Sequence, residues 1–228
     1  MKQQERQQKS REKILSAAMQ EFAERGYEEV TVDSICQKYE ISKGMLYHYY
    51  SGKDALFLLC VQHTFQQLEE YLLERMEQLE QKDPVEAMQE YFLLRESFFQ
   101  ENPQQKQIFE AALLRAPIQL TEQIEQIRQP LIRVNREFLH RTLLRLPLQK
   151  GLEQEEVLRY FCGVETVIWK LMEAYCPQVH MGDTHLLMQT VRRVIRMILF
   201  GVVTLPEGES RKSEQEQPER IENTNWIL

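Results

Sequence analysis

Apolar residues near the start of the chain recur every four positions, as they do along one face of a helix. Ile14, Ala18 and Phe22 form this series. Ser10 precedes the series and is suited to cap the helix. Gly26 follows it and can adopt the left-handed conformation common just past a helix end. The pattern predicts a helix that begins at Ser10 and stops at Gly26.

Two shorter helices are predicted directly afterwards. Thr31 can cap a helix over residues 32 to about 39, and Asp33 in its first turn favours the helix dipole. Ser42 can cap another helix over residues 43 to about 49. Two short helices joined by a tight turn, behind a supporting helix, are the arrangement of a helix-turn-helix.

The remainder of the chain follows a helical pattern to about residue 204. A long fourth helix is predicted to open at Lys53 and to run toward Leu79. Two further strong helices are expected over residues 153 to about 175 and 183 to 204. Breaks between helices are expected at Pro84, Pro103, Pro117 and Pro147, and a kink or a helix start at Pro130.

These elements predict an all-α fold in three parts. Residues 1–53 are expected to form an N-terminal arm and a three-helix DNA-binding domain, and residues 54–205 a larger helical domain. Residues 206–228 are polar until the last three positions, so a mostly disordered tail is expected there.

Composition and charge sharpen this picture. Eight glycines and eight prolines among 228 residues are few, which favours long helices over many turned strands. The net charge is −7, but residues 1–53 hold 9 basic and 8 acidic residues, whereas the rest holds 19 basic and 27 acidic. A slightly basic end on an acidic body fits a nucleic-acid-binding domain attached to a larger partner domain.

Several classes of protein are disfavoured. We expect no signal peptide, because the first residues are polar and charged, and no membrane span, because no apolar stretch is long enough. The four cysteines are scattered, which argues against a zinc site or a disulfide framework. No nucleophile elbow, phosphate loop or paired-carboxylate arrangement is present. We therefore expect a cytoplasmic protein that is not an enzyme and has no cofactor or metal.

The third helix carries the side chains expected to meet DNA. Lys43 can reach a base edge or a phosphate, Gly44 allows close approach of the backbone, and Met45 can touch a thymine methyl. Leu46 is expected to face the core. The full set of expected DNA-binding residues is Thr31, Ser42, Lys43, Gly44, Met45, Tyr47, His48, Tyr49 and Lys53.

This region resembles the DNA-binding domain of the TetR/AcrR-type repressors. The resemblance covers about residues 9–60, and its anchors fall together at fixed offsets. They are Gly26, Thr31, Ile35, Ser42, Gly44, Leu46, Tyr47, Lys53 and Leu56.

Four positions depart from the family pattern. Tyr39 and Glu40 stand where alanine and glycine are common, so Glu40 is expected to adopt a left-handed conformation or the turn to differ slightly. Tyr50 replaces phenylalanine, and Gly52 replaces the serine that often caps the fourth helix, at a cost of a few tenths of a kcal/mol.

The resemblance implies that the larger domain binds a small-molecule effector and forms a homodimer. In such proteins the last two long helices pair with their copies. The expected interface residues are Val157, Phe161, Val164, Ile168, Leu187, Val191, Val194, Ile195 and Ile198. The expected ligand-binding residues are Tyr91, Phe92, Phe98, Phe109, Phe138, Glu165, Trp169, Met172 and Tyr175. Each of these residues can also be ordinary core or surface.

The function favoured by these features is transcription regulation. The expected partners are double-stranded operator DNA, a second copy of the chain and an effector of unknown identity. A repressor that binds a palindromic operator as a homodimer, and that the effector releases, fits them best. The alternative is a helical interaction protein that has lost specific DNA binding, for which Tyr39, Glu40 and the modest basic charge are the support.

Overall fold

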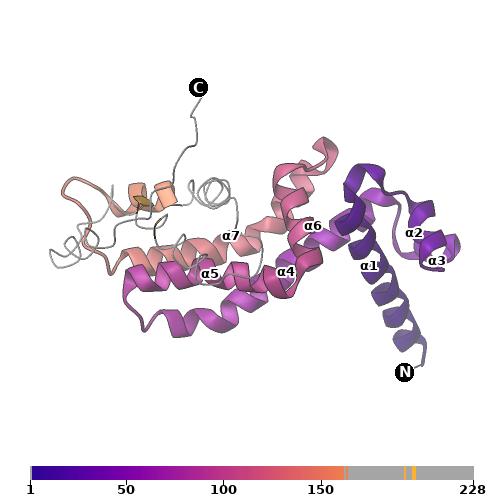
Figure 1. Ribbon diagram of the computed structural model, residues 1–228, viewed down its shortest axis with the longest axis horizontal. Helices are drawn as coiled ribbons and strands as arrows, with labels where there is room; N and C mark the ends of the chain where they lie inside the picture. The colour runs from indigo at the N-terminus through magenta and orange to yellow at the C-terminus, as the bar shows by residue number, and fades with distance from the viewer. Residues whose placement is uncertain (1, 162, 164–192, 194–196, 199–228) are drawn as a thin grey trace, which may run out of the picture.

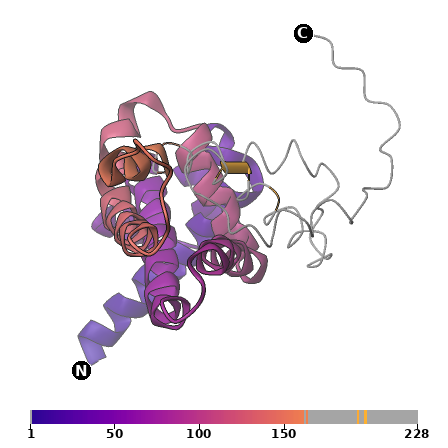
Figure 2. The same ribbon diagram turned by 90° about the vertical axis from the view of Figure 1, so that its left-hand side faces the viewer.

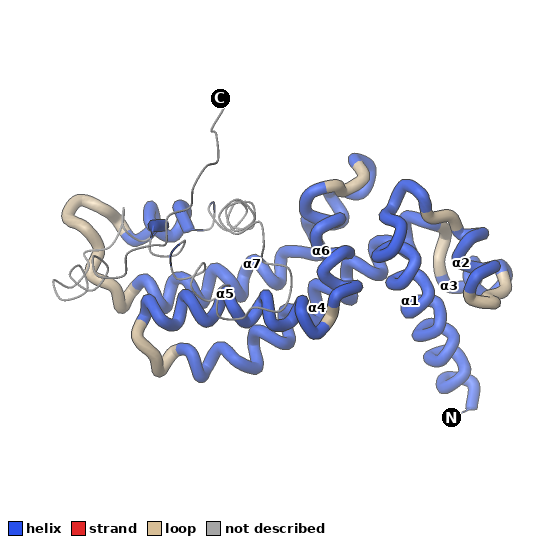
Figure 3. The backbone as a smooth tube through the Cα atoms, viewed as in Figure 1, coloured by secondary structure: helices blue, strands red, loops and turns tan. Residues whose placement is uncertain are grey.

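The computed structural model of the chain describes residues 2–161, 163, 193 and 197–198. Within these residues the regular elements are all helices, which confirms the all-α prediction (Figure 3). The first three helices lie at one end of the molecule, and the fourth leads from them into the larger helical part (Figure 1).

Helix α1 spans Lys2–Glu29 and is longer than predicted. The predicted start at Ser10 is wrong, because the Ser10 hydroxyl lies inside the helix and donates to the Arg6 carbonyl at 2.9 Å. The preceding residues are mainly glutamine, glutamate, lysine and arginine, which favour helix without an apolar pattern to reveal it. Gly26 leaves the helical conformation at φ 75°, so the predicted break is present, with a further short stretch of helix to Glu29.

Helices α2 (Val32–Lys38) and α3 (Lys43–Tyr49) form the predicted pair of short helices. The Thr31 hydroxyl accepts from the Ser34 N–H at 3.0 Å, and the Ser34 hydroxyl accepts from the Thr31 N–H at 3.2 Å. The Ser42 hydroxyl accepts from the Met45 N–H at 3.1 Å. Both predicted caps are confirmed, and they fix where the two helices begin.

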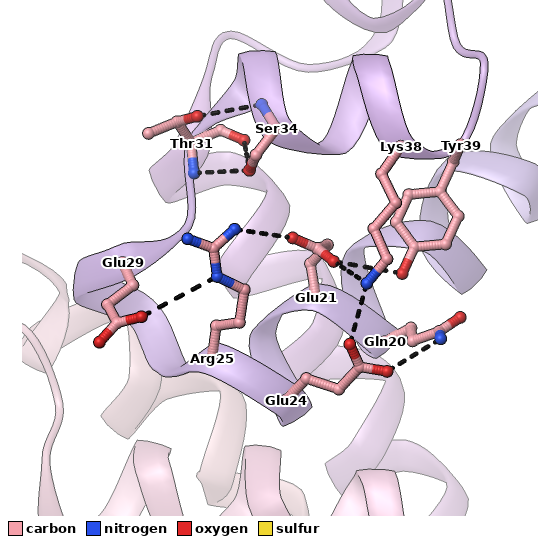
Figure 4. Close-up of polar contacts among 9 residues, drawn as sticks. All are labelled: Gln20, Glu21, Glu24, Arg25, Glu29, Thr31, Ser34, Lys38 and Tyr39. Carbon is pink, nitrogen blue, oxygen red and sulfur yellow. Dashed lines mark hydrogen bonds and ion pairs between the residues drawn. The ribbon is translucent and has the colours of Figure 1, made fainter.

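A cluster of charged side chains fastens α2 to α1 (Figure 4). The Lys38 amine lies 2.5 Å from the buried carboxylate of Glu21 and 2.9 Å from that of Glu24. Arg25 adds an ion pair to Glu21 at 3.5 Å, and the Tyr39 hydroxyl donates to the same carboxylate at 3.4 Å. Because Glu21 is buried, these partners are needed to offset the loss of its hydration.

Helix α4 (Lys53–Leu79) connects the two parts of the molecule. It contacts α1 at one end and packs along its length against α5 (Pro84–Glu101), α6 (Pro103–Leu114) and α7 (Thr121–Leu143) (Figures 1 and 2). A short 3-10 helix, η1 (Ile118–Leu120), precedes α7.

The prolines act largely as expected. Pro84 and Pro103 begin helices, and Pro117 lies in the loop that leads into η1. Pro147 follows the end of α7, and Pro130 lies inside that helix. The predicted breaks at Pro84, Pro103, Pro117 and Pro147 are confirmed.

The two expected C-terminal helices lie mostly outside the described residues. Residues 154–161 are helical, as predicted for the first of them. The expected tail, residues 206–228, lies outside the described part.

Candidate nucleic-acid interface

Helix α3 divides into an inner and an outer face. Leu46 is fully buried in the core shared with α1 and α4, as predicted. Ser42, Lys43, Gly44, Tyr47 and His48 are exposed, and 53% of the Tyr47 surface is accessible to solvent. The expected DNA-contacting residues at the start and on the outer face of α3 therefore lie on one accessible surface, the outer face of the helix-turn-helix.

Two of the expected contact residues on α3 are partly covered by the protein. Met45 and Tyr49 are half-buried and pack against the core. The Arg11 guanidinium lies over the Tyr49 ring at 5.3 Å, and the His48 ring meets its edge at 4.8 Å. Tyr49 thus joins α3 to α1, and its contact with DNA stays a prediction.

The turn between α2 and α3 accommodates the two unusual residues of the sequence. Glu40 adopts the left-handed conformation that was expected, with φ 51°. Its carbonyl accepts a hydrogen bond from the Lys13 amine at 3.0 Å. The Tyr39 hydroxyl joins the charged cluster by donating a hydrogen bond to the Glu21 carboxylate. The helix-turn-helix forms despite both departures.

An ion pair links the two short helices across the outer face. The Lys43 amine lies 2.8 Å from the Asp33 carboxylate. The hydrogen bond to this carboxylate raises the pKa of Lys43. The sequence pattern associated Asp33 only with the dipole of α2, and no feature of the sequence signalled its proximity to Lys43.

Lys53 occupies the junction between α1 and α4. Its amine donates to the Glu28 carbonyl at 3.1 Å and lies 4.2 Å from the centre of the Tyr27 ring. Thr31, at the start of α2, is exposed. The structure therefore places Lys53 in a contact within the chain, and its expected contact with phosphate stays a prediction.

The described residues of the expected ligand site are buried in the larger helical part. The Tyr91 and Phe138 rings stack at 4.0 Å, and the Tyr91 hydroxyl donates to the Asn135 side chain. The Phe109 ring packs near Phe65, at 5.1 Å, and nearer to Phe99. Phe92 and Phe98 are also buried, whereas Glu165, Trp169, Met172 and Tyr175 lie outside the described residues.

Three of the expected dimer residues are described. Val157, Phe161 and Ile198 are buried within the single chain. The other expected interface residues, Val164, Ile168, Leu187, Val191, Val194 and Ile195, lie outside the described part. The expected interface stays a prediction.

The described residues include no group of three or more histidine, cysteine or acidic residues placed to hold a metal ion. None of their helices combines the length and the apolar character that a membrane crossing needs.

Comparison with known proteins places the N-terminal helices in a family. Residues 14–60 match the family model described as bacterial regulatory proteins, tetR family. The chain is 37% identical over 81 residues to YxaF, an uncharacterised HTH-type transcriptional regulator of Bacillus subtilis. It is 32% identical over 63 residues to IcaR of Staphylococcus epidermidis, the negative transcriptional regulator of the biofilm operon icaADBC.

These sequence matches cover only part of each protein. They span 35% of this chain and 41% of YxaF, and 28% of this chain and 34% of IcaR. The chain thus spans less than half the length of the curated relatives that it matches.

The likeness of the fold extends further. The crystal structure of the transcriptional regulator FadR from Bacillus subtilis, in complex with stearoyl-CoA, aligns with a TM-score of 0.64 and 16% identity. The alignment covers 83% of this chain and 97% of that one. Residues 14–60 thus match the tetR family model, and most of the chain shares the fold of FadR.

Proposed function

We propose that the chain is a transcription regulator, and specifically a repressor that binds a palindromic operator as a homodimer. The observation that carries this proposal is the outer face of α3, where Lys43, Gly44, Tyr47 and His48 are exposed on a helix anchored by buried Leu46. A short helix held in this way, with polar and aromatic side chains outward, fits the major groove.

The homodimer follows from the size of one recognition helix. A helix of seven residues reads only a few base pairs, and related helix-turn-helix proteins use two half-sites about 34–36 Å apart. A two-fold symmetric dimer presents two such helices to a palindrome. The negative regulation named for IcaR supports repression as the outcome.

Release by a small-molecule effector is the remaining part of the proposal. The larger helical part holds a buried aromatic group that includes Tyr91, Phe109 and Phe138, as an apolar ligand site requires. The stearoyl-CoA bound to the similarly folded FadR supports a small-molecule effector for this chain. An effector that binds one arrangement of α4 more tightly than another would lower the affinity for DNA.

The alternative, an interaction protein without specific DNA binding, has less support. It rested on Tyr39, Glu40 and the modest basic charge, and both residues fit the helix-turn-helix without disturbing α3. The match of residues 14–60 to the tetR family model agrees with the expectation that the chain is not an enzyme.

The test is binding of the purified full chain to the promoter DNA that flanks its own coding region, measured over a series of salt concentrations. The Lys43→Ala, Tyr47→Ala variant removes two exposed side chains of α3. Its matched control, Lys150→Ala, Tyr160→Ala, removes the same two residue types from exposed positions in the larger part. We expect binding with the stoichiometry of a dimer that the first variant loses and the control keeps. Equal, weak binding of all three proteins to promoter and shuffled DNA would favour the alternative.

A further inference from the structure

The ion pair between Asp33 and Lys43 lies on the surface that the proposed function presents to DNA. Lys43 is the first residue of α3, and Asp33 lies in the first turn of α2. Their charged atoms are 2.8 Å apart, and the side chains of Lys43 and Asp33 are 59% and 69% exposed, respectively. A carboxylate therefore lies beside Lys43, which is expected to contact DNA.

The fold does not require this carboxylate. The start of α2 is already capped by the reciprocal hydrogen bonds of Thr31 and Ser34. The buried contacts of α2 come from Ile35 and Cys36, and its attachment to α1 comes from Lys38. Asp33 adds a favourable charge at a helix start, but it stabilises α2 much less than these contacts do together.

The direction of a lysine side chain depends on a neighbouring carboxylate. Its ammonium group is a point charge on a flexible stem, so a partner decides where it points. Phosphates attract it equally in every DNA sequence, and this attraction supplies most of non-specific binding. The Asp33 carboxylate lies 2.8 Å from the Lys43 amine, where it is placed to compete with phosphates for that amine.

We propose that Asp33 determines DNA specificity as a positioning residue that acts through Lys43. It lowers the affinity for unrelated DNA by occupying the Lys43 amine, and it releases the amine only where a matching site offers better contacts. The inference rests on the proposed function. It adds Asp33, whose negative charge repels the DNA phosphates, to the residues expected to determine DNA binding.

The test compares the full-length chain with the Asp33→Asn variant on two duplexes of equal length. One duplex carries the promoter DNA flanking the coding region, and the other carries a shuffled sequence of the same composition. Asparagine keeps the size and capping ability of aspartate but removes its charge. We expect about twofold to fivefold tighter binding to the shuffled duplex, the range set by the strength of an exposed ion pair.

Salt dependence supplies a second readout. Freeing one lysine for a phosphate is expected to steepen the slope of log affinity against log salt by about 0.9. The ratio of promoter affinity to shuffled affinity is expected to fall. A loss of helix stability alone would weaken binding to both duplexes and would not steepen the slope.

Two controls isolate the action through Lys43. Glu28→Gln removes one exposed negative charge from the same end of the molecule, away from the ion pair. The double variant Asp33→Asn, Lys43→Ala tests the coupling, because the effect of Asp33→Asn is expected to vanish once Lys43 is absent.

The outcomes separate the two proposals. An Asp33→Asn variant that matches Glu28→Gln, or that keeps its effect without Lys43, would overturn the positioning role and leave the proposed function intact. Wild-type protein that binds both duplexes weakly and equally would overturn the proposed function, and the inference with it. Thermal unfolding of each variant confirms that it is folded.

Discussion

The side-chain amide of Gln119 donates a hydrogen bond to the hydroxyl of Tyr27 at 3.0 Å, across 92 positions of the chain. The same hydroxyl donates to the Asp54 carboxylate at 2.5 Å. Tyr27 lies near the end of α1, Asp54 in the first turn of α4 and Gln119 in η1. One phenol therefore joins the N-terminal helices to η1, which precedes α7.

Tyr27→Phe is expected to lower the free energy of unfolding by about 1–2 kcal/mol, because it removes both hydrogen bonds and keeps the packing of the ring. The ring itself contacts Phe22 and Phe57, so the core is not disturbed. Urea unfolding of the variant measures the change. Tyr160→Phe, which alters an exposed tyrosine in the larger part, is the comparison, and an equal loss in both would contradict the special role of Tyr27.

The stability of the chain is expected to fall in alkali partly through Tyr27. Burial, followed by the hydrogen bond to Asp54, raises the pKa of Tyr27 to about 12. A raised pKa means that the folded state holds the proton more tightly than the unfolded chain, whose tyrosines titrate near 10. The stabilisation is complete below about pH 10 and is lost as the pH rises toward 12. The free energies of unfolding of wild type and Tyr27→Phe should therefore converge between about pH 10 and 12. A difference that stays constant over this range would refute the raised pKa of Tyr27.

Ser42 allows helix capping to be separated from DNA binding. Ser42→Ala is expected to lower stability by about 1 kcal/mol, because the Met45 N–H loses its acceptor. Ser42→Asp is expected to keep the cap and the stability but to weaken DNA binding, since it places a negative charge beside Lys43. Thermal unfolding and promoter binding of the two variants measure these effects. The exposed Ser51, altered to alanine, supplies a control for the serine hydroxyl itself.

Glu40→Gly is expected to stabilise the chain by about 0.5–1 kcal/mol. The left-handed conformation at φ 51° is strained for a residue with a Cβ, and glycine removes that strain at some cost in unfolded-chain entropy. Chemical denaturation measures the gain. Glu40→Gln keeps the Cβ and should show no gain, and an equal gain in both variants would assign the effect to charge.

The helix-turn-helix could be predicted closely because its determinants are local. Thr31 and Ser42 bond within three residues of themselves, so the sequence alone places the starts of α2 and α3. The burial of Leu46 also follows from helix periodicity, and the conformation of Glu40 from the departure at the turn. The start of α1 could not be found in this way, since its first residues carry propensity but no apolar pattern.

Contacts between residues that are far apart along the chain could not be predicted from the sequence. The sequence predicts a DNA contact for Lys53 but not the contact of its amine with the Glu28 carbonyl, 25 positions earlier, which forms because the end of α1 lies beside the start of α4. The pairing of Asp33 with Lys43 depends in the same way on how two helices cross. The aromatic residues of the larger part could be predicted to be buried, but helical periodicity does not distinguish a packed core from a ligand site.

The three N-terminal helices are fastened together at separate points, by Lys38 on Glu21, Arg11 on Tyr49 and Lys13 on the Glu40 carbonyl. The larger part contacts this group through α1 and α4, so we expect a motion of the larger part to turn the group as a unit and to leave its shape unchanged. On the proposed function, the bases read in each half-site and the distance between half-sites would be governed by different parts of the chain. A regulator of the proposed kind could come to respond to a new effector while it continues to bind the same DNA sequence.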